Sequence, residues 1–204
     1  MSADWIETYT GVSFFSLNPS PDDVRIEDIA HALSQKCRFN GHTSHFYSVA
    51  AHSINVQREL EARGADVRTQ LIGLLHDASE AYLPDVPSPI KPLLNGFKEV
   101  EKRVEIAIFN AFGLHPNDEE LVIVKGADND LLAWEAHKLM PCRNWSPKPK
   151  NKIHIDRYVK GAVSTVQDVE SIFMQTFGRL ADLLAREVDN QSTVYLSVSD
   201  NESR

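Results

Sequence analysis

The sequence predicts an all-α protein, a bundle of about six helices. Apolar residues recur three and four positions apart in several long segments, most clearly over 97–112, which is the spacing of a helix with one buried face. Strict alternation of apolar and polar residues, the pattern of a half-buried strand, is nearly absent. Gly, Pro and Asn signals separate the periodic segments, so each is expected to form its own helix.

Boundary signals divide the chain into the expected helices. These span residues 20–35, 44–63, 66–82, 97–112, 119–140 and 166–186. Ser20 and Asp66 offer side-chain oxygens that can cap the first backbone N–H groups of a helix. Gly64 and Gly113 follow the last apolar residue of a segment, where glycine commonly ends a helix. The segments on either side of Gly64 are therefore expected to form an antiparallel helical hairpin.

The connecting segments differ from the helices in composition. Residues 1–20 hold scattered aromatics and predict an irregular or short-strand segment laid against the domain. Four prolines between residues 84 and 92 exclude a regular helix there, because proline lacks the backbone N–H and clashes inside a helix. Residues 141–151 are rich in Pro, Lys and Asn, which predicts a surface loop.

The length of 204 residues suits one large domain with a substantial core. We expect this single domain to cover residues 1–188, with its last helix over about 166–186. A polar tail over 189–204 is expected to follow, with a short strand at 194–196.

Charge and cysteine content limit the function. A net charge of −8 argues against binding to nucleic-acid polymers or to an anionic membrane, which normally needs a basic face. No apolar run approaches the roughly 18 residues that a spanning helix needs, and the first residues lack the features of a signal peptide. Cys37 and Cys142 have no CxxC partner, so both are interpreted as structural or incidental in a reducing, cytoplasmic protein.

His52 and His76 occupy matching positions in the expected hairpin. They lie twelve and eleven residues from the Gly64-Ala65 turn, so both stand about 17 Å from it at 1.5 Å per residue. Their imidazoles can therefore meet across the interface between the two helices. Asp77 would add a carboxylate beside His76.

Two further acids can join this group. Glu80 follows His76 by four residues, so a continuous helix would place both on one face. Asp128 can reach the group from a later helix, and Asp130 competes with it for this role. Mixed imidazole and carboxylate ligation suits a divalent cation at an open, catalytic site rather than a closed thiolate zinc site. Mn, Co, Zn, Fe and Mg are the candidate metals, and the pattern leaves the choice between them open.

These residues resemble a known signature. His52, the His76-Asp77 doublet and Asp128 resemble the H…HD…D pattern of the HD-domain metal-dependent phosphohydrolases. The run His76-Asp-Ala-Ser-Glu80, Pro-Asp85 and Pro-x-Pro-x-Lys91 is similar to that of two groups, the bacterial 5′-deoxynucleotidases and the phage-type HD triphosphohydrolases of dNTPs, including dATP. The similarity covers about residues 25–140. It implies an HD-domain helical bundle in which the four signature residues bind the metal.

The resemblance also implies roles for other residues. Glu80 would activate the attacking water or deliver a proton, and Asp85 would support that water or a further metal. Phe39 falls where the relatives place an aromatic on the sugar or base. The basic residues that resemble the family's phosphate-binding positions are Arg38, Lys91 and Lys125. The chain departs from the relatives in two respects: the spacing from His52 to His76 is shorter, and an alanine precedes His52 where the deoxynucleotidases have an acid.

The expected function is phosphate hydrolysis on a small-molecule deoxynucleotide. Three basic positions suit a polyphosphate better than a single phosphate, which favours a deoxynucleoside triphosphate such as dATP. A 5′-deoxynucleotidase acting on dNMPs and a non-catalytic nucleotide-binding sensor remain alternatives. The further motif of cyclic-nucleotide HD-GYP domains is not visible. The protein is expected in the cytoplasm, or in the host cytoplasm if it is phage-encoded, and a homo-oligomer is left open.

Overall fold

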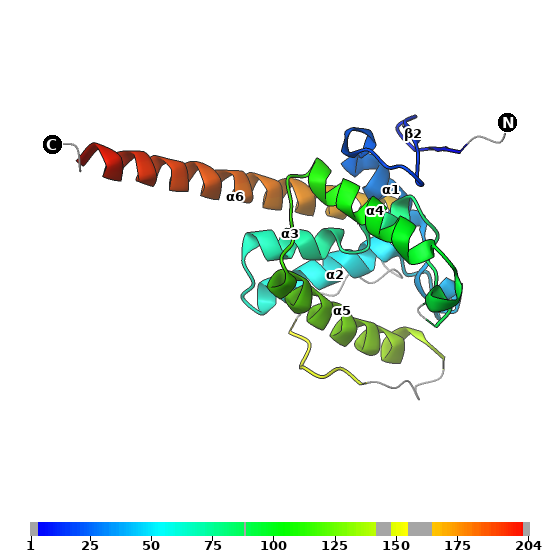
Figure 1. Ribbon diagram of the computed structural model, residues 1–204. Coiled ribbons are helices and arrows are strands. Elements are labelled where there is room, and N and C mark those ends of the chain that lie inside the picture. Colours follow the sequence, from blue (N-terminus) through cyan, green and yellow to red (C-terminus); the bar gives the residue numbers. More distant parts are fainter. Residues whose placement is uncertain (1–3, 88, 142–147, 155–164, 202–204) are drawn as a thin grey trace.

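The computed structural model of the chain describes residues 4–87, 89–141, 148–154 and 165–201 (Figure 1). Helices dominate the described residues, and the all-α prediction is confirmed. The α-helices are α1 (Ile26–Gln35), α2 (Val49–Ala62), α3 (Val67–Leu75), α4 (Phe97–Ala111), α5 (Asp118–Leu139) and α6 (Val166–Asn201). The 3₁₀ helices are η1 (Pro21–Asp23), η2 (Arg38–Gly41), η3 (Ala78–Ala81) and η4 (Lys91–Leu93). The predicted N-terminal strand segment is a small antiparallel hairpin of β1 (Ile6–Glu7) and β2 (Ser13–Phe14), with Ile6 opposite Phe14.

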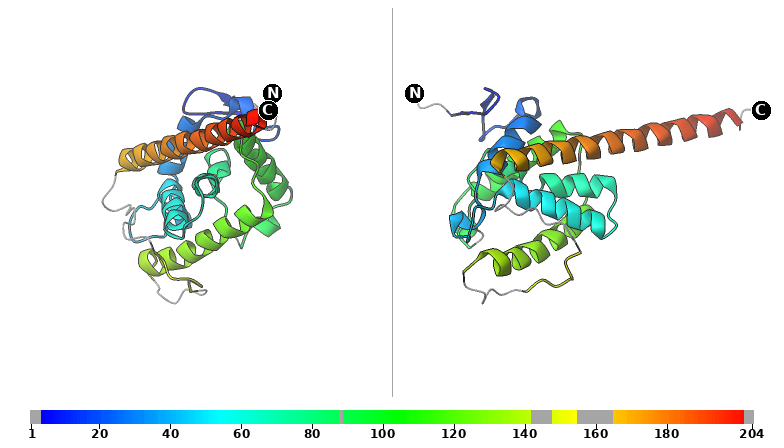
Figure 2. Two further views of the ribbon diagram at one scale, coloured as in Figure 1. Left: turned by 90° about the vertical axis from the view of Figure 1, so that its left-hand side faces the viewer. Right: turned by 180° about the vertical axis from the view of Figure 1, so that it is seen from behind.

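Helix α2 lies at the centre of the bundle. It contacts α1, α3, α5 and α6, and the views in Figures 1 and 2 place α6 and α5 on opposite sides of the α2–α3 pair. Every residue from 49 to 57 is buried, polar residues included. The central helix therefore carries His52 and Asn55 into the interior, where their polar atoms need partners from neighbouring helices.

The hairpin of α2 and α3 is confirmed, and its two helices pack closely. Gly64 forms the turn with φ 80°, and the Asp66 side chain accepts the Thr69 N–H at 2.7 Å, which caps α3 as predicted. At Gly73 an added Cβ would overlap the Leu60 side chain of α2. Glycine at this position therefore permits α2 and α3 to pack closely here.

Helix α3 ends at Leu75, so the predicted continuous helix as far as Tyr82 is wrong. His76 keeps helical dihedral angles, but Asp77 leaves them at φ −102° and ψ 14°, and η3 follows. In a continuing helix the Gly73 carbonyl would accept the Asp77 N–H. Here that carbonyl accepts from His76 Nδ1 at 2.8 Å. The break therefore falls between the two residues of the predicted metal-binding doublet.

Two other helices begin later than predicted. Helix α1 begins at Ile26, because the Ser20 side chain caps only the three-residue η1. Helix α2 begins at Val49, because Ser48 is extended and caps the helix with its own side chain. Ser48 also pairs with Cys37 in an isolated antiparallel bridge, which holds the segment before α2 in an extended conformation.

Helix α6 continues through Asn201, so the predicted end near residue 186 and the predicted strand at 194–196 are both wrong. Neither glycine nor proline follows Gly178 to stop the helix. Its first half packs on α1, α2 and α3, and its last half projects beyond the bundle (Figure 1). Cys142 and part of the predicted loop over 141–151 lie outside the described residues. No helix among those described is long and apolar enough to cross a membrane.

Candidate metal centre

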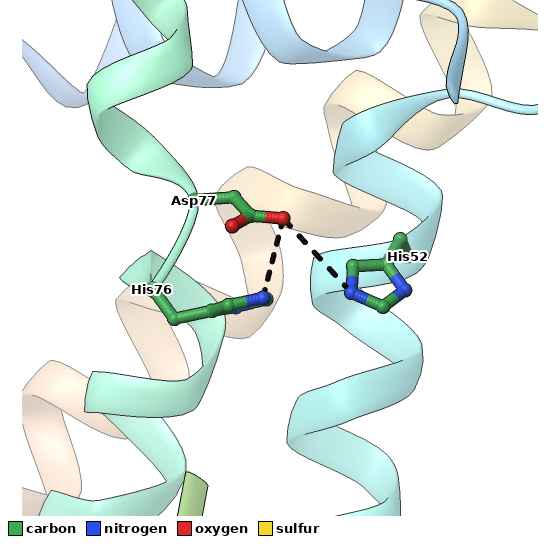
Figure 3. Close-up of side chains that lie close together, drawn as sticks. All are labelled: His52, His76 and Asp77. Carbon is green, nitrogen blue, oxygen red and sulfur yellow. Dashed lines mark ion pairs between the residues drawn. The ribbon is translucent and has the colours of Figure 1, made fainter. Parts of the chain in front are cut away.

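His52, His76 and Asp77 bring three potential metal ligands together (Figure 3). One ligand atom from each side chain lies within 4.8 Å of the other two. His52 comes from α2 and the His76-Asp77 pair from the end of α3, and the two imidazole centroids are 5.3 Å apart. The predicted meeting of the imidazoles across the hairpin is confirmed. This group could hold a metal ion.

Two carboxylates face both imidazoles. Asp77 Oδ2 lies 3.2 Å from His76 Nε2 and 3.9 Å from His52 Nε2. Asp128 Oδ1, which comes from α5, lies 3.1 Å from His52 Nε2 and 3.8 Å from His76 Nε2. The structure thus places Asp128 beside the other three predicted ligands. Imidazole nitrogens and carboxylate oxygens are both donors that divalent cations accept in proteins.

Asp130, the competing candidate, binds other partners. Its Oδ2 accepts from Arg63 at 3.1 Å and from the Asn151 side chain at 2.7 Å, and its Oδ1 accepts the Lys150 N–H at 2.6 Å. These bonds tie the segment 148–154 to α5. Asp130 therefore has a structural role, and the choice of Asp128 over Asp130 agrees with the geometry.

The buried polar atoms of the group fit a cation. His76 Nδ1 donates to the Gly73 carbonyl, so in a neutral ring Nε2 is the unprotonated nitrogen that faces the carboxylates. His76 Nε2 is buried and makes no hydrogen bond to any of the residues described. It lies 3.2 Å from Asp77 Oδ2 and 3.8 Å from Asp128 Oδ1, so a cation held by these carboxylates could also take this nitrogen as a ligand.

The imidazoles and carboxylates of this group shift one another's pKa values. Burial lowers the pKa of His76, but the Asp77 and Asp128 carboxylates outweigh burial and raise this pKa well above its ordinary value. Burial also lowers the pKa of His52, and Glu135 and Asp128 reverse that shift. Burial alone would raise the pKa of Asp77, yet the His76 imidazolium holds it well below its usual range. Without a metal, protons on the imidazoles neutralise the carboxylates.

We expect divalent-metal binding to this group to strengthen as pH rises. Both imidazoles have raised pKa values in the metal-free protein, and each must lose a proton from Nε2 before that nitrogen can bind a cation. Below the raised pKa the proton competes with the metal, and above it the competition ends. Calorimetric titration with Mn²⁺ between pH 6 and 9, in buffers of different ionisation enthalpy, should show rising affinity and proton release. An affinity independent of pH, without proton release, would contradict this charge arrangement.

Glu80 sits on η3 as a nearly buried acid with a raised pKa. Its side chain is 6% exposed, and Oε2 makes no hydrogen bond within the described chain. Burial, together with repulsion from Asp77 and Asp85, raises the pKa of Glu80 to about 8. The Lys36 ammonium donates to the carbonyl oxygens of Glu80 and Leu83 and so fixes this turn. The predicted shared helical face is wrong, because α3 ends first, but the 3₁₀ turn still keeps Glu80 within electrostatic reach of Asp77.

Arg38 and Phe39 approach the metal-binding group from η2. Arg38 donates from Nη1 to Asp77 Oδ2 at 3.2 Å, and its Nε lies 3.6 Å from Glu135 Oε2. The Phe39 ring lies beneath this guanidinium, 5.7 Å from Cζ. Phe39 and Asn40 adopt left-handed backbone angles, with φ 53° and 51°, which are costly for residues other than glycine and concentrate at functional sites. Arg38 is thus ion-paired with carboxylates of the centre, and its phosphate-binding role stays a prediction.

The two predicted phosphate-binding lysines are also ion-paired. Lys91 Nζ donates to Glu101 Oε1 at 2.8 Å. Burial lowers the pKa of Lys91, but Glu101, with smaller contributions from Glu80 and Asp77, raises it above its ordinary value. Lys91 also borders a surface pocket of about 470 Å³ between η4 and α4. Lys125 Nζ donates to Asp128 Oδ2 at 2.7 Å and is 68% exposed. The phosphate-binding role of both lysines therefore stays a prediction.

Glu135 is the residue of the centre that the sequence prediction missed. It is completely buried on α5 and accepts from His52 Nδ1 and from the Tyr47 hydroxyl. The signal was present in the sequence, because Glu135 lies four residues after Leu131 and four before Leu139, within an apolar helix face. An acid in a core stripe needs a buried partner, and here that partner is His52, one of the candidate metal ligands.

Comparison with known proteins identifies relatives of the chain, but their names indicate no activity. No protein-family model matches the chain. The uncharacterized protein YfdR of Escherichia coli K12 is 39% identical over 135 residues, which cover 66% of this chain and 72% of that protein. An uncharacterized protein of Rhodobacter capsulatus is 41% identical over 120 residues, which cover 56% of this chain and 61% of that protein. Neither name states a function. By the extent of its match, the chain belongs to the same family as YfdR of Escherichia coli.

Proposed function

We propose that the protein is a divalent-metal-dependent phosphohydrolase of deoxynucleotides, with deoxynucleoside triphosphates such as dATP as the favoured substrates. The observation that carries this proposal is the convergence of His52, His76, Asp77 and Asp128 beside the buried acid Glu80. The same residues carry the resemblance to the HD-domain phosphohydrolases. An open mixed-ligand centre next to a proton-holding carboxyl suits hydrolysis better than a purely structural site.

Different residues of the chain would have different roles in such a reaction. The two imidazoles and two carboxylates would hold the cation, which when bound acidifies water and neutralises phosphate oxygens. Glu80, whose pKa is raised to about 8 in the metal-free protein, would pass a proton to the leaving oxygen. Asp85 raises that pKa further and so helps to keep the acid protonated. Lys91 and Lys125, at the edge of the centre, would bind phosphate oxygens as point charges.

A 5′-deoxynucleotidase is the second candidate, and one observation favours it. Arg38 is paired with Asp77 and Glu135 and is nearly buried, whereas Lys91 and Lys125 are paired but more exposed. Fewer basic groups are therefore available for a substrate than the sequence suggests. Two lysines would suffice for a single phosphate, whereas a triphosphate would gain from all three basic residues. The triphosphate substrate therefore requires Arg38 to contribute from its ion-paired position.

Product analysis separates these candidates. Mn²⁺- or Co²⁺-loaded protein would be incubated with dNTPs, NTPs and dNMPs, and the products separated by ion-exchange chromatography. We expect deoxynucleoside and tripolyphosphate from dNTPs. Orthophosphate released only from dNMPs would instead identify a 5′-deoxynucleotidase. Nucleotide binding without metal-dependent turnover on any substrate would contradict the enzyme proposal and favour a non-catalytic sensor.

A further inference from the structure

We propose that Glu135 is a positioning residue of the metal centre, which fixes the His52 ring so that Nε2 faces the metal. The inference rests on the metal-binding part of the proposed function and not on the substrate. Glu135 contacts His52 at Nδ1, on the opposite side of the ring from the Nε2 that would bind a metal. It acts through His52, whose two ring nitrogens face two different carboxylates.

The contacts of Glu135 are those of a buried clamp. Both of its carboxylate oxygens lie close to His52 Nδ1, at 2.9 and 3.0 Å. The Tyr47 hydroxyl donates to Glu135 Oε1 at 2.6 Å, and Asn55 Nδ2 donates to the same hydroxyl at 3.0 Å. Glu135, Tyr47, Asn55 and His52 are all completely buried. The network therefore leads from the core to the centre without contact with solvent.

This arrangement dictates which nitrogen of His52 can bind a metal. A carboxylate that faces Nδ1 stabilises the proton on that nitrogen. The lone pair then stays on Nε2, which lies 3.1 Å from Asp128 Oδ1 and 3.9 Å from Asp77 Oδ2. A hydrogen bond to the distal nitrogen of a metal-binding histidine fixes its tautomer and orientation and raises its basicity.

Helix α5 supplies both carboxylates that hold His52. Asp128 faces Nε2 and Glu135 faces Nδ1, and the two acids are seven residues, or about two helical turns, apart. One helix therefore positions both Asp128, a proposed metal ligand, and Glu135, which holds His52. His76 has an equivalent support in the Gly73 carbonyl, which accepts from its Nδ1. Both imidazoles are thus held through Nδ1 and present Nε2 to the same point.

The test is the metal affinity of Glu135→Gln, measured by calorimetric titration with Mn²⁺ at pH 8. The amide keeps the shape of the side chain but removes the charge that favours the Nδ1 proton. We expect Mn²⁺ to bind about 10–100-fold more weakly, as is typical when the partner of a metal-ligand histidine is lost. Tyr47→Phe, which removes one donor to Glu135 and keeps the ring, should weaken binding less and provides the test if Glu135→Gln does not fold.

A spectroscopic readout separates positioning from a general loss of structure. In Zn²⁺-loaded protein labelled with ¹⁵N-histidine, the His52 Nδ1 proton should give a protected, downfield signal. This signal should move upfield or exchange faster in Glu135→Gln. Asp130→Asn is the matched control, since it makes the same change on a buried acid of the same helix but one bound to Arg63 and segment 148–154. The control should keep the Mn²⁺ affinity and the His52 signal of the unmodified protein.

The outcomes distinguish this inference from the proposed function. Equal Mn²⁺ affinity and an unchanged His52 signal in folded Glu135→Gln would overturn the positioning role and leave the proposed function intact. An unmodified protein that binds Mn²⁺ but hydrolyses no nucleotide would overturn the proposed function. In that case weaker Mn²⁺ binding by Glu135→Gln would still establish the positioning role.

Discussion

His76→Ala is expected to abolish divalent-metal binding and, with it, all metal-dependent phosphate release. The change removes an imidazole whose Nε2 is buried, makes no hydrogen bond to the described residues, and lies 3.2 Å from Asp77 Oδ2 and 3.8 Å from Asp128 Oδ1. Loss of a ligand's hydrogen-bond partner alone weakens metal binding by about 10–100-fold, so loss of the ligand itself should exceed that range. Calorimetric titration with Mn²⁺ and a phosphate-release assay on the same samples measure both effects.

His115→Ala is the control for this variant. His115 is exposed in the loop before α5, and its backbone carbonyl, which accepts from Arg68, is unaffected by the substitution. The control should bind Mn²⁺ and turn over substrate like the unmodified protein. If folded His76→Ala kept the Mn²⁺ affinity of the unmodified protein, the assignment of the metal to this group would be wrong.

Glu80→Gln is expected to lower turnover by about 10²–10⁴-fold while Mn²⁺ binding persists, which is the typical loss for a general acid or base. The amide fits the same buried space but cannot exchange a proton with substrate or water. Glu119→Gln, a change to an exposed acid in the first turn of α5, serves as the control and should leave turnover unchanged. Turnover by Glu80→Gln within a few-fold of the unmodified protein would exclude proton transfer by Glu80.

The same variant should change how stability depends on pH in the metal-free protein. The pKa of Glu80 is raised to about 8 in the folded state, so the native protein holds this proton more tightly than the unfolded chain does. The contribution is therefore complete below the ordinary pKa of a glutamate and is lost as pH rises towards 8. Urea unfolding in the presence of a chelator should show Glu80→Gln gaining stability relative to the unmodified protein between pH 5 and 8. A stability difference that does not vary with pH would contradict the raised pKa.

Much of the candidate metal centre was predictable because it depends on helix geometry. The positions of His52 and His76 on either side of Gly64 predict that the imidazoles meet, and their centroids are 5.3 Å apart. The rise per residue of a helix is constant, so the number of residues from the turn predicts how far along the hairpin each side chain lies. The order of Asp128 and Asp130 on α5 could be chosen only from the family pattern, and the contacts of Asp130 agree with that choice.

Other features depend on contacts that counting cannot supply. Helix α3 ends where His76 Nδ1 donates a hydrogen bond to the Gly73 carbonyl. The periodicity of apolar residues cannot predict such a side-chain hydrogen bond. The left-handed backbone at Phe39 is likewise imposed by its surroundings rather than by the residue's own preference. Glu135 was missed because an acid on a helix is ordinarily solvated, and only its place in the apolar stripe of α5 marks it as buried.

Anomalous diffraction from a Mn²⁺-soaked crystal would locate the metal without reference to any substrate. We expect an anomalous peak within bonding distance of His52 Nε2, His76 Nε2, and the carboxylates of Asp77 and Asp128. We also expect Glu135 to keep its hydrogen bond to His52 Nδ1 on the far side of the ring. A well-occupied peak elsewhere, with none at this group, would contradict the assignment of the centre and the hydrolytic function proposed from it.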